Sequence, residues 1–242
     1  MQHFSAIPTL IKIIEDCTQE AVVRHEAAEA LAAFRDPKFI EVLRRFTSSE
    51  CVELAETCKI AVDYLKWISD LQSDQEKSSV SVFGTLDPAP PLDNKIDNAA
   101  GLDEIARIFM DTNQPLFSRY RAMFSLRNIG TREAVEVLIE GFKDSSALFK
   151  HEIAFVFGQL QSEYAVQSLM NVLRDDTEHP MVRHEAAEAL GAIASRKEIY
   201  TLLKEFSASH HPRIIRESCH VALDMYEYGK SEEFEYTLNH FS

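Results

Sequence analysis

Three His-Glu dipeptides are the residues of this sequence best suited to hold a metal ion. They are His25-Glu26, His151-Glu152 and His184-Glu185, and the last two are separated by 184 − 151 = 33 residues. Two imidazoles and one carboxylate around an ion leave coordination positions open, which suits a non-haem Fe(II) that takes up O₂. The pairs therefore predict metal sites, with iron as the leading candidate.

A different metal motif, His-Glu-x-x-His on one helix, is typical of zinc proteases. Here the fifth position is Glu29, Phe155 or Glu188, which argues against that class. Glu29 and Glu188 lie one helical turn after a histidine. They either orient its ring through a hydrogen bond or are solvated helix formers.

The residues around the pairs belong to an internal repeat. The nine residues 23–31 recur as 182–190, identical throughout, at an offset of 184 − 25 = 159. A shorter unit of ~30–35 residues with two helices lies inside each half, which is typical of helical solenoids. In one unit the second helix is expected from Met181 to Ala194, with Pro180 at its start. Each His-Glu pair falls near the start of such a second helix, so His151 and His184 should approach each other from adjacent helices.

The scarcity of glycine (7) and proline (8), together with the lack of alternating polar and apolar residues, predicts an all-α chain without a sheet. The repeats divide it into an N-terminal half, 1–68, and a related C-terminal half, 101–242. Residues 69–100 are rich in serine and contain Asp87-Pro88-Ala89-Pro90-Pro91. They are expected to form a linker that is partly extended and mobile.

Composition narrows the classes of partner and location. The net charge of −14 repels phosphate backbones and argues against nucleic acid. It either attracts a cationic partner or simply keeps the protein soluble. The four cysteines form no C-x-x-C pair, no apolar run reaches the roughly 18–20 residues of a membrane span, and no signal peptide is visible. These features predict a cytoplasmic protein with reduced thiols and no membrane partner.

Several of these motifs, taken in order, resemble one known family, deoxyhypusine hydroxylase. The matching segments are residues 87–91, 119–124, 149–152, 182–185, 216–219 and 222–228, and the resemblance covers essentially the whole chain. It implies an α-solenoid of HEAT-like helical hairpins. It also implies a monooxygenase that uses O₂ and two Fe(2+) ions per complete site. The substrate would be the deoxyhypusine side chain of a translation factor precursor, which is converted to hypusine.

The resemblance also assigns roles to residues. By the pattern of the family, His151, His184 and Glu185 would hold one iron, and His25 and Glu26 would belong to the other. Glu152 would bind the substrate, because a carboxylate pairs well with the cationic amines of deoxyhypusine.

The sequence departs from the family pattern at its start. The family has four His-Glu pairs, whereas this chain has three. The partner of His25 would fall at 25 − 33 = −8, before Met1. We therefore expect a chain truncated at its N-terminus, a weaker second iron site and one substrate glutamate fewer, which puts its full activity in question.

Two other functions are compatible with the residues. A non-catalytic helical scaffold would bind proteins along its concave face and hold no stoichiometric metal. A metalloenzyme with another divalent ion, for example a hydrolase, would bind metal but show no visible absorption band when O₂ is added.

Overall fold

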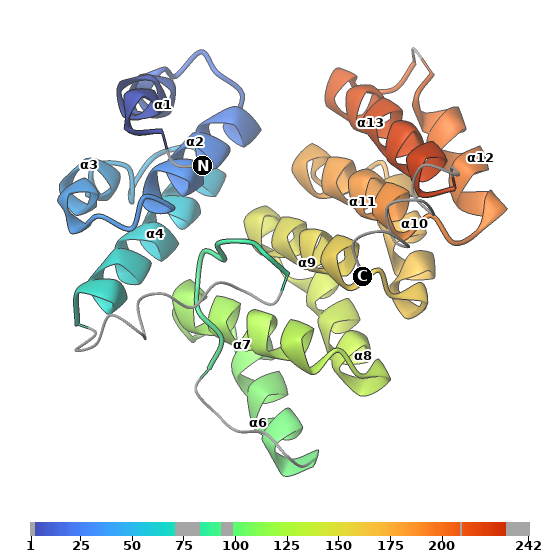
Figure 1. Ribbon diagram of the computed structural model, residues 1–242, viewed down its shortest axis with the longest axis horizontal. Coiled ribbons are helices and arrows are strands. Elements are labelled where there is room, and N and C mark those ends of the chain that lie inside the picture. The colour runs from blue at the N-terminus through green and yellow to red at the C-terminus, as the bar shows by residue number, and fades with distance from the viewer. Residues whose placement is uncertain (1–2, 71–82, 93–98, 209, 231–242) are drawn as a thin grey trace, which may run out of the picture. The chain divides into compact units, whose positions relative to one another are not determined.

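A computed structural model describes residues 3–70, 83–92, 99–208 and 210–230. All regular elements in these ranges are helices (Figure 1), so the predicted all-α class is confirmed. In the same ranges, no helix has the length and apolar character that crossing a bilayer requires. The chain forms two compact units, Met1–Asn128 and Ile129–Ser242. Solenoid repeats contact only their neighbours, so this division need not match the halves 1–68 and 101–242, which stay a prediction.

The first unit contains α-helices of 5 to 19 residues. They are α1 (Ile7–Glu15), α2 (Ala21–Ala32), α3 (Ile40–Arg44), α4 (Val52–Asp70), α6 (Ala99–Met110) and α7, which begins at Leu116 and ends at Ile129. The second helices α2 and α4 pack against each other. Their shared core includes Leu31, Leu43, Leu54 and Leu65, none of which is exposed.

The second unit contains three helix pairs. They are α8 (Arg132–Glu140) with α9 (Ala147–Leu160), α10 (Val166–Arg174) with α11 (Pro180–Ile193), and α12 (Lys197–Phe206) with α13 (Arg213–Gly229). Figure 1 shows the second helices α9, α11 and α13 side by side, with α11 in contact with both others. The helix expected from Met181 to Ala194 is thus confirmed to within one residue, and Pro180 is its first residue.

One arginine joins the two helices of a pair in three repeats. The guanidinium Nε of Arg24, Arg119 and Arg183 donates to the carbonyl oxygen of the residue ten positions earlier, at 3.1, 2.9 and 3.1 Å respectively. Those acceptors are the penultimate residues of α1, α6 and α10: Ile14, Phe109 and Leu173. The carbonyls at a helix end lack intrahelical partners. The arginine therefore satisfies one of them and fixes where the second helix starts.

The turn between the helices of these same pairs also repeats. Asp16 and Asp175 each accept hydrogen bonds from the backbone N–H (2.9 Å) and the hydroxyl (2.7 Å) of the threonine two residues later. Asp111 accepts from the N–H of Asn113 at 3.0 Å. An aspartate that bonds its own backbone two residues on stabilises a tight turn.

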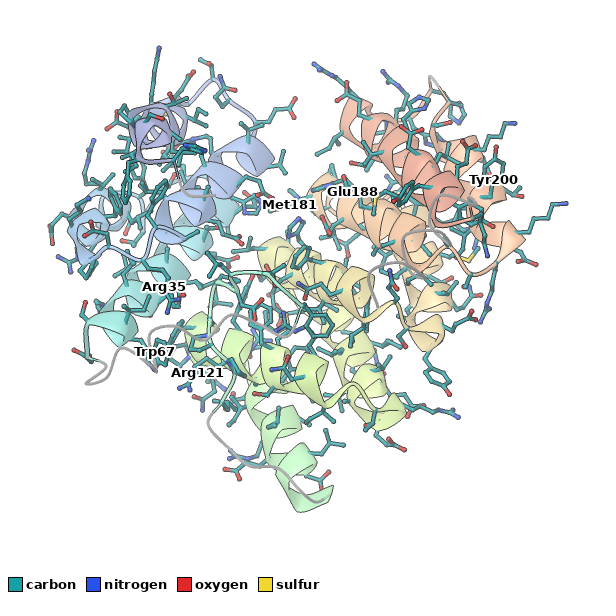
Figure 2. All side chains as sticks on the ribbon, viewed as in Figure 1. Arg35, Trp67, Arg121, Met181, Glu188 and Tyr200 are labelled. Atoms are coloured by element: carbon teal, nitrogen blue, oxygen red, sulfur yellow. The ribbon has the colours of Figure 1, made fainter. Side chains whose placement is uncertain are left out.

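Residues 83–92 are the only described stretch between α4 and α6, and they are fixed to α7. The side chain of Arg127, which is 0% exposed, pairs with Asp87 at 2.6 Å. Arg121 donates to the carbonyls of Pro90 and Pro91 at 3.1 and 3.0 Å. Arg121 also lies over the ring of Trp67 in α4, 5.9 Å from its centroid (Figure 2). One buried ion pair and several hydrogen bonds thus hold these ten residues against α7, whereas the expected mobility of the linker stays a prediction.

The other residues of the predicted linker lie partly in helices and partly outside the described ranges. Residues 69–70 end α4 and residues 99–100 begin α6, so the first two and the last two residues of the predicted linker belong to helices. Residues 71–82 and 93–98, like the tail 231–242, lie outside the described residues.

Candidate metal centre

All three histidines of the His-Glu pairs occupy the same position in their helices. His25, His151 and His184 are each the fifth residue of a helix that starts at Ala21, Ala147 and Pro180. All three are buried, with exposed fractions of 0%, 5% and 7%. The repeat thus places each imidazole inside the protein, one turn into its helix.

In the second unit, His151, His184 and Glu185 form a cluster. Each offers one ligand atom, and these three atoms all lie within 4.8 Å of one another. The ring centroids of the two histidines are 5.3 Å apart, and His151 Nε2 lies 3.4 Å from Glu185 Oε2. The expected approach of His151 and His184 from adjacent helices is therefore confirmed.

The donor set fits a metal ion. Nitrogen and oxygen ligands lie about 2.0–2.2 Å from an ion such as zinc, so ligands on opposite sides are about 4 Å apart. The cluster needs only a slight contraction to reach that spacing. His184 Nε2 is fully buried, and no described residue forms a hydrogen bond with it. Since a buried polar atom without a partner costs roughly 1–3 kcal/mol, a bound ion would stabilise this arrangement.

The other ring nitrogen of His184 faces polar groups of the protein. Its Nδ1 lies 3.6 Å from Glu188 Oε1 and 3.5 Å from Ser218 Oγ. Burial alone would raise the pKa of the Glu188 carboxyl, but contacts with His184 and Ser218 outweigh it and hold the pKa below its ordinary value. An ionised carboxylate, that of Glu188, therefore lies next to Nδ1 of the His184 imidazole.

In the first unit, His25 and Glu26 lie next to each other, with His25 Nε2 3.3 Å from Glu26 Oε1. The Glu26 side chain is 59% exposed, whereas the imidazole is buried. A carboxylate that reaches both solvent and a buried imidazole can join a ligand set. Its role as a ligand stays a prediction.

Glu152 follows His151 in α9, and its side chain is buried. The cluster of ligand atoms around His184 includes Glu185 rather than Glu152. A buried carboxylate beside the cluster but outside it is compatible with the expected contact to a cationic substrate, which also stays a prediction.

Sequence reasoning missed two groups that support the cluster. Lys150 stands where Arg24, Arg119 and Arg183 stand in other repeats, but it pairs with Glu178 in the turn before α11, at 2.5 Å. This ion pair links the helix of His151 to the start of the helix of His184. The sequence feature that could have indicated this ion pair is the replacement of arginine by lysine at one repeat position. Ser218 is the second group that sequence reasoning missed. The sequence feature that could have indicated it is the recurrence of a hydroxyl residue, Thr57, at the equivalent position in the first half.

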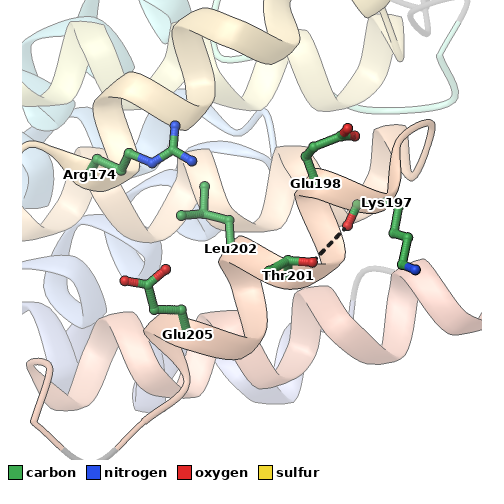
Figure 3. A pocket seen from close by; sticks show the side chains of 6 residues that line it. All are labelled: Arg174, Lys197, Glu198, Thr201, Leu202 and Glu205. Atoms are coloured by element: carbon green, nitrogen blue, oxygen red, sulfur yellow. Dashed lines mark hydrogen bonds between the residues drawn. The ribbon is translucent and has the colours of Figure 1, made fainter.

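A separate pocket of about 310 Å³ lies on α10 and α12 (Figure 3). It is lined by Arg174, Lys197, Glu198, Thr201, Leu202 and Glu205. It contains none of the predicted ligands, and its two cations are balanced by two carboxylates. It is therefore distinct from the metal cluster.

Comparison with family models supports the repeat architecture. Residues 135–224 match the model described as HEAT repeats. Residues 23–49 and 118–144 match the model described as PBS lyase HEAT-like repeat. The predicted HEAT-like solenoid is confirmed.

Comparison with individual proteins is more specific. The chain is 46% identical over 236 residues to deoxyhypusine hydroxylase of Drosophila melanogaster, covering 98% of this chain and 75% of the relative. Identity to the Homo sapiens enzyme is 45% with the same coverage. The solved structure of human deoxyhypusine hydroxylase in complex with glycerol matches 93% of this chain and 75% of that chain, with a TM-score of 0.84.

Proposed function

Because the chain belongs to the deoxyhypusine hydroxylase family, we propose that it hydroxylates deoxyhypusine in a translation factor precursor at a centre of two Fe(2+) ions, with O₂ as oxidant. The observation that carries this proposal is the 46% identity over 98% of this chain, together with the cluster of His151, His184 and Glu185. The non-catalytic scaffold is disfavoured, since the relatives are enzymes by name. The four free cysteines support a reducing, cytosolic location.

In this proposal His151, His184 and Glu185 hold one iron, and His25 and Glu26 contribute to the other. Two imidazoles and one carboxylate leave sites for O₂, which favours iron over a closed zinc site. When bound, the iron centre supplies the activation of O₂ for hydroxylation of a C–H bond. The surrounding helices keep the three ligands at or below 9% exposure, which limits access of water to the reaction.

We assign Glu152 to the substrate. Its carboxylate would pair with an ammonium group of deoxyhypusine, a charge-assisted interaction that is stronger than a neutral hydrogen bond. The net charge of −14 would also attract a cationic side chain over longer range.

Replacement of His184 tests the ligand assignment. We expect His184→Ala to remove iron from the cluster in the second unit and to abolish hydroxylation of a deoxyhypusine-bearing substrate protein. Iron is measured per chain after anaerobic loading with Fe(II), and helicity by circular dichroism shows whether the variant folds. His220→Ala, an exposed histidine on α13, serves as the control. Iron content in His184→Ala equal to that of the wild type would refute the assignment.

A further inference from the structure

We infer that Glu188 and Ser218 position His184, holding the proton of its ring on Nδ1 so that Nε2 faces the metal site. This inference deepens the proposed function and rests on it. It gives both residues a role in metal affinity, although neither touches the ion.

The first step of the argument is the bond between α11 and α13. The hydroxyl of Ser218 donates to Glu188 Oε1 at 2.7 Å. Ser218 is 7% exposed, so its hydroxyl has little access to solvent as an alternative partner. The bond fixes the carboxylate of Glu188, which is labelled in Figure 2, on the side of α11 that faces α13.

The second step is the position of the imidazole. His184 Nδ1 lies within 3.6 Å of both Glu188 Oε1 and Ser218 Oγ. These distances exceed the roughly 2.7–3.2 Å of a standard N–H···O bond, so the inferred bond requires the ring to turn slightly toward the two oxygens. Both oxygens can accept a hydrogen bond from Nδ1–H, so the neutral ring carries its hydrogen on Nδ1. The lone pair is then left on Nε2, which has no hydrogen-bond partner among the described residues.

The third step is the close approach that brings Ser218 within reach. A Cβ on Gly191 would lie 2.5 Å from the carbonyl oxygen of Ala222. Gly191 follows Glu188 by three residues and Ala222 follows Ser218 by four, so the contact lies about one turn from the Ser218–Glu188 bond. The missing side chain of Gly191 therefore lets α13 approach α11 closely enough for the hydroxyl to reach the carboxylate.

The equivalent helices of the first unit differ at these positions. The offset of 159 places Ala32 where the second unit has Gly191, and the offset of 219 − 58 = 161 places Thr57 where it has Ser218. The hydroxyl of Thr57 donates to the backbone carbonyl of Glu53 at 2.8 Å, within its own helix. Of these two equivalent pairs of helices, the pair with the glycine is the one in which a hydroxyl of one helix donates to a carboxylate of the other.

A carboxylate or hydroxyl behind a metal-bound imidazole fixes its tautomer and orientation, and its loss typically costs about 10–100-fold in metal affinity. We expect Glu188→Ala to weaken Fe(II) binding by about that factor, measured by competition with a chelator. Ser218→Ala should have a smaller effect, because the carboxylate remains. Glu217→Ala is the control, since this carboxylate is adjacent to Ser218 in sequence but pairs with Arg213.

The tautomer gives a readout that does not depend on metal or activity. Nitrogen NMR of histidine-labelled protein, assigned with His184→Ala, should show the proton of His184 on Nδ1 in the wild type. Glu188→Ala should shift it toward Nε2. Glu188→Gln keeps an acceptor oxygen and should preserve the tautomer with an intermediate affinity.

The outcomes separate this inference from the proposed function. If the wild type bound no Fe(II), the ligand assignment would fall, and the tautomer would still decide the positioning role. If the wild type bound Fe(II) but carried the proton on Nε2, or if Glu188→Ala bound it as tightly, the positioning role alone would be refuted.

Discussion

At the scale of single residues, the glutamates in two neighbouring copies of the His-Glu motif have different surroundings. In α9 and α11 a glutamate follows each histidine, yet only Glu185 contributes an oxygen to the cluster with His151 and His184. Glu152 is 3% exposed and belongs to the same helix as His151. Under the proposed function, the same His-Glu motif would supply a metal ligand in one copy and a substrate contact in the other.

Replacing Glu152 with glutamine tests its proposed contact with the substrate. Gln keeps the size of the side chain but removes the charge. A hydrogen bond to a charged group is worth roughly 1.5–3 kcal/mol, so we expect KM for the deoxyhypusine substrate to rise about 10–100-fold, with a smaller change in kcat. Iron content should stay at the wild-type level.

The control for this experiment is Glu163→Gln, which neutralises an exposed carboxylate that pairs with Arg196. If Glu152→Gln lost iron instead of substrate affinity, the residue would have to be assigned to the metal.

At the scale of elements, the spacing of α9, α11 and α13 is set by small residues and by one ion pair. Gly158 lets α9 approach Ala189 of α11, and Gly191 lets α11 approach Ala222 of α13. Lys150 and Glu178 tie α9 to the turn before α11. Since His151 and His184 belong to α9 and α11, these contacts set the distance between the two imidazoles.

The two glycines give a matched pair of variants. A Cβ at Gly191 would overlap Ala222 at 2.5–2.8 Å, whereas a Cβ at Gly158 would meet Ala189 at 3.4 Å or more. Overpacking typically costs about 1–3 kcal/mol, while Gly to Ala in a helix gains at most about 1 kcal/mol. We expect Gly191→Ala to lower Tm by several degrees and Gly158→Ala to leave it unchanged or raise it, as measured by calorimetry. Equal effects of the two substitutions would contradict the close approach of α11 and α13.

At the scale of the whole molecule, acid should remove stability from both units through the same turn. Hydrogen bonds from the Thr18 hydroxyl and N–H lower the pKa of the Asp16 carboxyl to about 2. Bonds from Thr177 lower the pKa of Asp175, and bonds from Asn113 lower that of Asp111. In each case the ionised carboxylate is the form that the fold favours.

The direction of the pH dependence follows from these shifts. A carboxyl whose pKa is lower in the folded state contributes stability above its unfolded pKa, and that contribution is lost as pH falls through the folded value. We therefore expect the urea concentration at the unfolding midpoint of the wild type to decrease as the pH is lowered from about 4 to about 2. The upper limit is the pKa of an aspartate in the unfolded chain. The variant Asp16→Asn, Asp111→Asn, Asp175→Asn should lose part of this dependence.

Circular dichroism in urea at several pH values measures this effect. Asp224→Asn, on the exposed side of α13, should leave the dependence as it is in the wild type. An unchanged slope in the triple variant would show that the turns do not cause the loss.

The sequence by itself determined the repeat unit, the helical class and the place of each histidine within its helix. These are local properties: the apolar period, the proline at a helix start and the recurrence of 23–31 at 182–190 fix them without knowledge of contacts. Because the repeat period carries each histidine to the same turn of its helix, the meeting of His151 and His184 followed from the sequence as well.

Only the tertiary structure decided which other groups act on the imidazoles. The bond between Ser218 and Glu188 joins residues 30 positions apart, and that between Lys150 and Glu178 joins residues 28 positions apart. Both bonds depend on how closely neighbouring helices approach each other. A glycine at one position changes that distance, and the pattern of residue types along the chain does not predict it. The packing of 83–92 on α7 is of the same kind, since a segment rich in proline becomes fixed only when buried partners such as Arg127 meet it.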